Sequence, residues 1–287
     1  MASRRRLQST LLTVLSVAVI AMIALCVPAF ASATSGRYVA LGDSFTAGSG
    51  VLPVETETPI FCARSLINYP HLAQIELDYD SFADVSCGAA QTKDMLGVQT
   101  VFGGAKHQPQ FNALTADTRL VTLGIGGNDI GFLPLGLSCL TLSPFGSPCK
   151  HNYVKNGVDE VEQRITATEP KIVATVQGIH ERSPLAKVFV VGYQRIVNPT
   201  GIGCWPKLPI AYGDAPWLDG IERHLNAMIK RVAESNGATY VDVYTPSIGH
   251  DACKTPNVRW VEPLSFINNY TPLHPNAAGE AAMERAL

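Results

Sequence analysis

The sequence predicts an α/β protein, a three-layer α/β/α sandwich with a five-stranded parallel sheet. Five short apolar runs have the length and composition of strands, and segments with helical periodicity separate them. The run at 187–192 holds four consecutive apolar residues, which is typical of a parallel strand buried on both faces. Strands that alternate with helices favour a doubly wound sheet covered on both sides. No Gly-x-Ser-x-Gly elbow or dinucleotide-binding Gly-x-Gly-x-x-Gly motif lies at a strand–helix junction, which argues against an α/β-hydrolase and a Rossmann enzyme.

Residues 1–33 have the pattern of an export signal peptide. Three arginines at 4–6 precede an apolar run at 11–27, and a small-residue triplet ends at Ala33. An uncleaved anchor is the alternative, because a run of roughly 17 apolar residues is at the lower limit for spanning a bilayer. Pro28 and the Ala-x-Ala site favour cleavage. We therefore expect residues 34–287 to form one secreted domain with no stable membrane anchor, with retention in the cell envelope as the alternative.

The charge of the remaining chain excludes two classes of partner. Without the three arginines of the signal, 19 basic and 24 acidic residues remain, a formal charge of −5. No run of basic residues remains either. We therefore expect neither a nucleic-acid partner nor electrostatic docking to an anionic membrane.

The first predicted strand, at 38–41, runs into a turn that carries Gly42, Asp43 and Ser44. This places Ser44 at the carboxyl end of a sheet, the edge where open α/β sheets bind ligands. Gly-Asp-Ser is also an ordinary surface turn, since all three residues suit turns. A functional role for Ser44 therefore depends on what other segments bring to the same edge.

The middle of the chain supplies two more strands that end in small or polar residues. The strand at 82–86 leads to Gly88, which lacks a Cβ and so lets its N–H approach a substrate, although it is also a plausible turn glycine. The strand at 119–124 leads to Asn128 in a Gly-Gly-Asn-Asp turn. Residues 94–114 follow no clear pattern. Before the strand at 82–86 we expect a proline-containing loop at 51–66 and a helix at 69–77. After the strand at 119–124 we expect an apolar loop at 130–137 that packs in the core or lines a pocket.

From residue 158 to the loop that carries His274, the sequence predicts helices and strands that support the fold and no catalytic residue. A helix at 158–179 bends or restarts at Pro170. Tyr193 and Trp205 are expected to pack in the core or loop, and His224 to be a surface helix residue. The remaining segments are a fourth strand at 187–192, a loop at 194–216, a helix at 221–232, a fifth strand at 239–244, and a closing helix at 276–287 preceded by His274.

Ser44, Asn128 and His274 together supply the groups that acyl transfer needs: a nucleophile, an oxyanion donor and a base. With Gly88, they match in order the four motifs of the GDSL or SGNH hydrolase superfamily, which the chain resembles. The resemblance spans nearly all of residues 34–287 and points to the secreted actinobacterial-type esterases and lipases. It implies a catalytic domain in which Ser44 and His274 react, while Ser44, Gly88 and Asn128 form the oxyanion hole. It implies no cofactor and no metal, and we expect a monomer that acts on a small-molecule or lipid ester.

Six cysteines follow the signal, and an even number in an exported chain indicates disulfides. No pair has the spacing of zinc ligands, and the sequence alone permits 15 pairings. Reduced, buried thiols are the alternative. The resemblance implies sequential pairing, with the bonds Cys62–Cys87, Cys139–Cys149 and Cys204–Cys253.

The chain departs from the family where most members have an aspartate three residues before the histidine, because Thr271 stands there. Some secreted members resembling this chain use a main-chain carbonyl just upstream of the histidine. We therefore predict a Ser44–His274 dyad oriented by the carbonyl of Thr271 or a close neighbour, since an acceptor for Nδ1–H suffices to fix the tautomer. Asp251 or Glu262, from the long loop, is the alternative.

Three functions remain open on the sequence. The resemblance implies a secreted serine esterase or lipase, and the apolar segment at 130–137 favours acyl-chain substrates. A carbohydrate O-deacetylase with the same fold is the second hypothesis. The third is a non-catalytic secreted binding protein, which Thr271 makes conceivable.

Overall fold

A five-stranded parallel sheet lies at the centre of the computed structural model, which describes residues 34–57, 59–264 and 271–287. The predicted export signal lies outside the described residues. Each neighbouring strand pair is parallel, in the order β2-β1-β5-β8-β9. The strands are β1 (Thr34–Gly42), β2 (Tyr79–Asp84), β5 (Thr118–Gly124), β8 (Lys187–Val191) and β9 (Thr239–Val241). The predicted fold class is thus confirmed, and the predicted second strand begins and ends earlier in the chain than expected.

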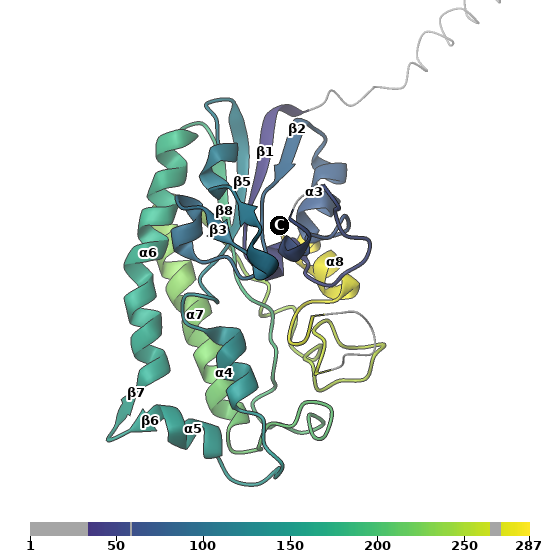
Figure 1. Ribbon diagram of the computed structural model, residues 1–287, viewed down its shortest axis with the longest axis vertical. Helices are drawn as coiled ribbons and strands as arrows, with labels where there is room; N and C mark the ends of the chain where they lie inside the picture. Colours follow the sequence, from purple (N-terminus) through teal and green to yellow (C-terminus); the bar gives the residue numbers. More distant parts are fainter. Residues whose placement is uncertain (1–33, 58, 265–270) are drawn as a thin grey trace, which may run out of the picture. The chain divides into compact units, whose positions relative to one another are not determined.

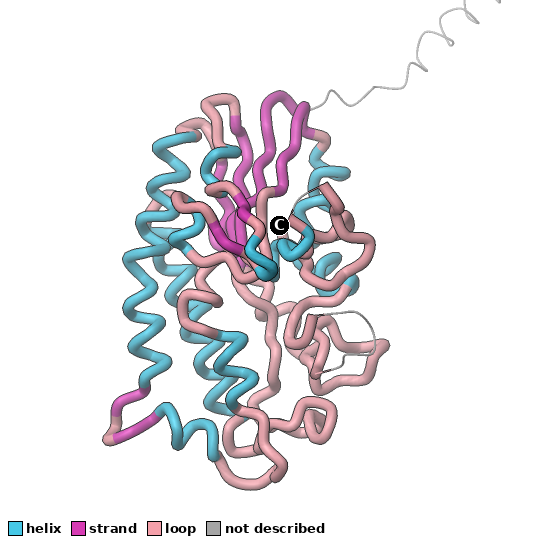
Figure 2. The backbone as a smooth tube through the Cα atoms, in the orientation of Figure 1, coloured by secondary structure: helices cyan, strands magenta, loops and turns pink. Residues whose placement is uncertain are grey.

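Helices cover both faces of the sheet (Figure 1). Helices α6 (Glu160–Arg182) and α7 (Ala215–Ser235) pack together, as do α3 (Tyr69–Leu77) and α8 (Ala277–Ala286). Side chains alternate along β1: Val39 packs in the core cluster of α6 and α7, whereas Tyr38 packs with residues of α3. Figure 2 shows the strands enclosed between these helices. Residues 34–287 form one compact unit.

Two predicted features of the chain change in the structure. The segment at 130–137, predicted as an apolar loop, mostly forms helix α4 (Phe132–Ser138). Pro134 is compatible with this helix because it lies in the first turn, where a helix does not need the proline N–H. Helix α6 continues through Pro170 without a restart.

The three predicted disulfides are all present, as Cys62–Cys87, Cys139–Cys149 and Cys204–Cys253. The first joins the loop before α3 to the segment that follows β2. The second closes the far end of α4 against helix α5 (Pro148–Tyr153). Both therefore fix segments that leave the carboxyl edge of the sheet. None of the helices in the described ranges is long and apolar enough to cross a membrane.

The strand order places a ligand site between β1 and β5. The chain leaves β1 to one side to form β2 and returns to the other side to form β5, and open α/β sheets bind ligands at such a reversal. Gly42 and Gly124 are register partners at the ends of these strands. The turns that carry Ser44 and Asn128 therefore start side by side.

Candidate active site

Ser44 occupies the first position of the short helix α2 (Ser44–Ala47), directly after β1. Asp43 caps this helix by accepting a hydrogen bond from Phe45 N at 2.9 Å. Gly42 is required, because a Cβ there would lie 2.7 Å from the carbonyl oxygen of Gly124. The N–H of Ser44 has no acceptor among the described residues, as expected at a helix start.

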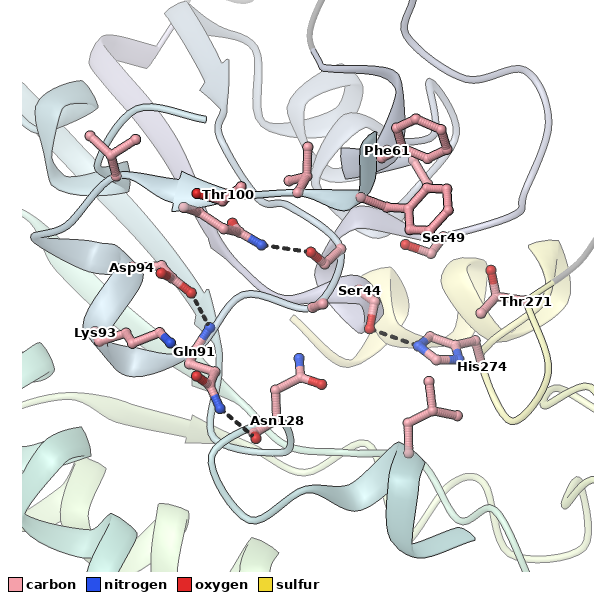
Figure 3. A pocket seen from close by; sticks show the side chains of 18 residues that line it. Ser44, Ser49, Phe61, Gln91, Lys93, Asp94, Thr100, Asn128, Thr271 and His274 are labelled. Atoms are coloured by element: carbon pink, nitrogen blue, oxygen red, sulfur yellow. Dashed lines mark hydrogen bonds between the residues drawn. The ribbon is translucent and has the colours of Figure 1, made fainter. Parts of the chain in front are cut away.

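His274 is hydrogen-bonded on both ring nitrogens, and the two partners define its tautomer. Nδ1 lies 2.8 Å from the carbonyl oxygen of Pro272. Nε2 lies 2.7 Å from Ser44 Oγ, a bond that Figure 3 shows as a dashed line. A carbonyl can only accept, so Nδ1 carries the proton and Nε2 is free to accept from the Ser44 hydroxyl. This is the arrangement that a serine needs to lose its proton to a base.

Burial keeps the His274 imidazole neutral. The ring is 4 % exposed, and desolvation lowers its pKa from 6.5 to about 4, although the hydrogen bond to Pro272 opposes the shift. At neutral pH the ring is therefore an available base rather than a cation. Phe45 packs beside it, with ring centroids 5.0 Å apart.

The carbonyl that faces His274 belongs to Pro272. The prediction that named the carbonyl of Thr271 is therefore wrong, and its alternative, the carbonyl of a close neighbour, agrees with the structure. Leu273 has a left-handed backbone with φ of 62° and turns the chain between Pro272 and His274. Thr271 instead lines the pocket, where Figure 3 shows it beside His274. The spacing of residues in a sequence does not reveal such a turn.

The two alternative carboxylates bond elsewhere. Asp251 Oδ1 accepts from Asn198 Nδ2 at 3.2 Å and from Cys253 N at 3.1 Å. Glu262 pairs with Arg259 at 2.5 Å and also accepts from Asn276. Neither contacts His274 Nδ1, which the carbonyl of Pro272 already occupies.

Asn128 follows β5 and reaches toward Ser44 (Figure 3). Its Nδ2 donates one hydrogen bond to the carbonyl of Ala90 at 3.0 Å, and its own carbonyl accepts from Gln91 Nε2 at 2.9 Å. An amide nitrogen has two hydrogens, so one remains for a ligand. The bond to Ala90 fixes the direction of that hydrogen, and the bond from Gln91 holds the main chain of Asn128.

Gly88 is placed near the site, but its N–H points away from it. This N–H donates to the carbonyl of Cys62 at 2.9 Å, which contradicts the predicted role of Gly88 as an oxyanion donor. The glycine lies close to a neighbouring main chain, since a Cβ there would be 3.2 Å from the carbonyl oxygen of Phe61. The next residue, Ala89, lines the pocket and has a left-handed φ of 62°. Its N–H has no acceptor among the described residues.

A cleft of about 510 Å³ opens over Ser44 and His274. Its lining contains both apolar and polar side chains. The apolar ones are mainly Phe61, Val98, Val101, Phe102 and Leu133, and the polar ones include Gln91, Lys93, Asp94, Gln99 and Thr100. Of the apolar segment at 130–137, Leu133 thus lines the cleft while Leu135 is buried in the core, so both sequence interpretations of that segment hold.

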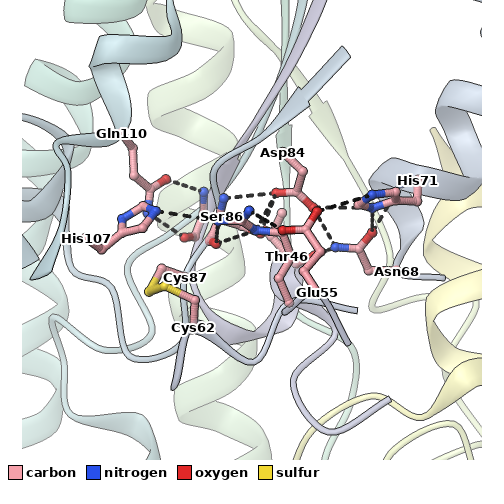
Figure 4. Close-up of polar contacts among 12 residues, drawn as sticks. Thr46, Glu55, Cys62, Asn68, His71, Asp84, Ser86, Cys87, His107 and Gln110 are labelled. Carbon is pink, nitrogen blue, oxygen red and sulfur yellow. Dashed lines mark hydrogen bonds and ion pairs between the residues drawn. A yellow bond between two sulfur atoms is a disulfide. The ribbon is translucent and has the colours of Figure 1, made fainter. Parts of the chain in front are cut away.

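Buried polar side chains behind the nucleophile turn hold it in place (Figure 4). Asn68 Nδ2 donates to the carbonyl of Thr46 at 2.9 Å and to Asp84 Oδ2 at 2.7 Å. Gln110 accepts from Gly42 N at 2.8 Å and donates to the carbonyl of Gly42 at 2.9 Å. Nothing in the sequence pattern singles these residues out, since their role depends on contacts between distant segments.

One group of three side chains in the described part of the chain has the spacing of metal ligands: Cys62, Cys87 and His107. The two cysteines are joined in a disulfide and offer no thiolate. This group therefore does not fit a metal ion.

Comparisons with known proteins match almost the whole of this domain. The model of the GDSL-like Lipase/Acylhydrolase family matches residues 40–282. Lipase 2 of Streptomyces coelicolor is 44% identical over 252 residues, which cover 86% of this chain and 82% of that protein. An esterase of Streptomyces scabiei is 30% identical and covers 75% of this chain and 72% of its own.

Two solved structures share the fold over the same region. Phospholipase A1 from Streptomyces albidoflavus superposes with a TM-score of 0.73 at 26% identity, covering 88% of this chain and 98% of that one. The extracellular lipase from Streptomyces rimosus gives a TM-score of 0.72 at 26% identity, with 88% and 97% covered.

Proposed function

The chain belongs to the GDSL-like lipase/acylhydrolase family, and on this premise we propose that it is a secreted serine esterase or lipase that hydrolyses carboxylic esters of acyl chains. The observation that carries the proposal is the hydrogen-bonded series from Ser44 Oγ through His274 to the carbonyl of Pro272. In it, His274 Nε2 already accepts a hydrogen bond from the nucleophile Ser44, and the Pro272 carbonyl fixes the tautomer of the histidine.

Catalysis begins with attack of Ser44 Oγ on the ester carbonyl carbon, while His274 Nε2 takes the hydroxyl proton. The carbonyl oxygen becomes an anion, which the N–H of Ser44, the N–H of Ala89 and the free Nδ2 hydrogen of Asn128 stabilise. His274 then gives its proton to the departing alcohol oxygen, and the acyl group stays on Ser44. Water attacks this acyl-enzyme with His274 again as base, which releases the acid and restores Ser44.

The cationic form of His274 lacks a carboxylate partner in this scheme. The carbonyl dipole of Pro272 stabilises it less than an anion does, but fixes the same ring orientation. A dyad therefore keeps the geometric part of the third residue's role and gives up part of its charge stabilisation.

The apolar lining residues of the cleft support acyl-chain substrates. Phe61, Phe102 and Leu133 offer hydrophobic surface beside Ser44, which suits an alkyl chain. The polar lining residues, among them Gln91 and Thr100, keep the carbohydrate O-deacetylase as a second candidate. The hydrogen bond between Ser44 and His274 does not favour a non-catalytic binding protein.

A substrate panel tests the proposal. Wild type and Ser44→Ala are compared on p-nitrophenyl acetate, on p-nitrophenyl esters of longer acids and on acetylated sugars. We expect turnover by the wild type that rises with acyl length beyond acetate, and none by Ser44→Ala. Faster release from acetylated sugars identifies a deacetylase. No turnover, together with no labelling of Ser44 by a fluorophosphonate, contradicts an esterase of either kind.

We also propose that residues 1–33 are removed on export and that residues 34–287 act as a monomeric catalytic domain outside the cell. The three disulfides support an oxidising compartment. Mass spectrometry of secreted protein should find a chain that begins at Thr34 with no free thiol. Thiols on several of the six cysteines, or a retained 1–33 segment, contradict the proposal.

A further inference from the structure

Tyr193 joins two of the three segments that carry the proposed oxyanion donors. Its hydroxyl donates to Asp43 Oδ2 at 2.6 Å and accepts from Gly127 N at 2.7 Å. Asp43 directly precedes Ser44, and Gly127 directly precedes Asn128. One buried hydroxyl thus connects the turn after β1 to the turn after β5.

The Tyr193 ring is itself held on several sides. Its main chain exchanges two hydrogen bonds with the Asn226 side chain of α7, at 2.8 and 2.9 Å. The Phe45 ring packs edge-on against it with centroids 5.0 Å apart. A Cβ on Gly127 would lie 3.0 Å from Cζ and from the hydroxyl oxygen of Tyr193, so a side chain at this position would press on the ring. The residue is 3 % exposed.

These contacts leave little freedom between the two turns. Asp43 is held at one carboxylate oxygen by Tyr193 and at the other by Phe45 N, so it does not contact His274. The register of β1 and β5 pairs Gly42 with Gly124, and the carbonyl of Gly124 also accepts from Asp43 N at 2.9 Å and from Thr46 Oγ1 at 3.5 Å. The hydroxyl of Tyr193 carries the connection further along the second turn, to Gly127 beside Asn128.

We propose that Tyr193 is a positioning residue that aligns the N–H of Ser44 and the side-chain amide of Asn128 on the same substrate oxygen. The inference rests on the proposed ester hydrolysis and adds a residue that does not touch the substrate. Stabilisation of an oxyanion requires its donors to converge on one position, and displacement by about 1 Å can cost 10²-fold in rate. Tyr193 thus acts through the two turns that it holds together.

Tyr193→Phe tests this by removing the hydroxyl and keeping the ring. We expect kcat on a short p-nitrophenyl ester to fall by about 10- to 100-fold, with KM within about twofold, because the donors act on the transition state. Tyr244→Phe is the matched control: Tyr244 is also buried and donates to a carboxylate, Asp219, at 2.6 Å, but it lies outside the cleft. The control should lose stability and keep its kcat.

A double-mutant cycle distinguishes positioning from general destabilisation. If Tyr193 acts through Asn128, then Tyr193→Phe should cost far less in an Asn128→Ala background than in the wild type. Additive losses, a kcat for Tyr193→Phe within twofold of wild type, or an equal loss in Tyr244→Phe would each overturn the inference. If Tyr193→Phe does not fold, Gly127→Ala takes its place, because its Cβ presses on the same ring. Failure of the proposed function is separate, since the wild type itself would then hydrolyse no ester.

Discussion

The imidazole of His274 is oriented by the main-chain carbonyl of Pro272, at 2.8 Å from Nδ1, in the place where a triad enzyme uses a carboxylate. Side-chain substitutions cannot remove a main-chain carbonyl. The orientation of the base therefore depends on the local path of the chain, which Leu273 sets with its left-handed conformation.

The first prediction concerns the absence of a carboxylate from the catalytic series. Ser44→Ala and His274→Ala should each abolish most activity, whereas Thr271→Ala should cost little because the Pro272 carbonyl remains. Asp251→Asn and Glu262→Gln should lower stability, since both acids have buried partners, but leave kcat of the folded protein near wild type. Steady-state kinetics with folding checked by circular dichroism decides this. A loss of about 10⁴ in kcat for either acid, as in a triad that loses its carboxylate, would identify it as the third catalytic residue.

The second prediction concerns pH. Because the pKa of His274 is lowered to about 4, kcat/KM should stay level as pH falls through 6.5 and should decline only near pH 4. The unfolded histidine binds its proton near pH 6.5 and the folded one near 4. The stability that His274 contributes is therefore fully present above pH 6.5 and is lost as pH falls toward 4.

Two measurements check these pH dependences of activity and of stability. A pH–rate profile locates the acid limb, and urea unfolding of wild type and His274→Gln between pH 4 and 7 isolates the contribution of the histidine. The wild type should lose more stability than the variant as the pH falls. An acid limb at pH 6 to 7 is incompatible with a histidine in this environment.

The third prediction concerns Asn128. Asn128→Ala should fold normally and lose about 10² to 10³ in kcat, the usual cost of removing one oxyanion donor. Asn236→Ala is the control, because Asn236 also donates its Nδ2 to a main-chain carbonyl, that of Val232, but at the end of α7. Near-normal turnover by Asn128→Ala would remove Asn128 from the mechanism.

The fourth prediction separates Ala89 from Gly88 as the main-chain donor. Replacing Ala89 with lactic acid, or Gly88 with glycolic acid, turns the amide into an ester and deletes one N–H. We expect the change at residue 89 to lower kcat by about 10² to 10³. The change at residue 88 should lower stability through the lost bond to Cys62 and spare kcat. The reverse result would restore Gly88 as the donor.

The sequence predicts the sheet and the reacting side chains well because both follow local rules. Ser44 and Asn128 come directly after buried strands, so the carboxyl edge of the sheet brings them together. The helix at 69–77 agrees with the structure residue for residue, since Asn68 caps its start and Pro70 lies in its first turn.

What the sequence does not predict depends on the direction of single backbone groups or on distant contacts. Glycine is the expected residue where an amide must face a ligand, yet Ala89 adopts the left-handed conformation and Gly88 does not. The Pro272 carbonyl likewise follows from a turn at Leu273, where no glycine marks it. The link from Tyr193 to Asp43 spans 150 residues and exists only in the folded chain.

Different segments of the chain supply the reacting groups and part of the apolar lining of the cleft. The reacting groups and the Pro272 carbonyl follow strand ends or precede α8, whereas Val98, Val101 and Phe102 stand in and beside the short hairpin of β3 (Gln99–Thr100) and β4 (Lys106–His107). No residue of that hairpin reacts in the proposed chemistry, but Gln99 Nε2 donates to the carbonyl of Gly88 at 2.8 Å, in the peptide that carries the Ala89 N–H. Replacing the apolar residues Val98, Val101 and Phe102 while Gln99 is kept is therefore a direct engineering route to new ester preferences.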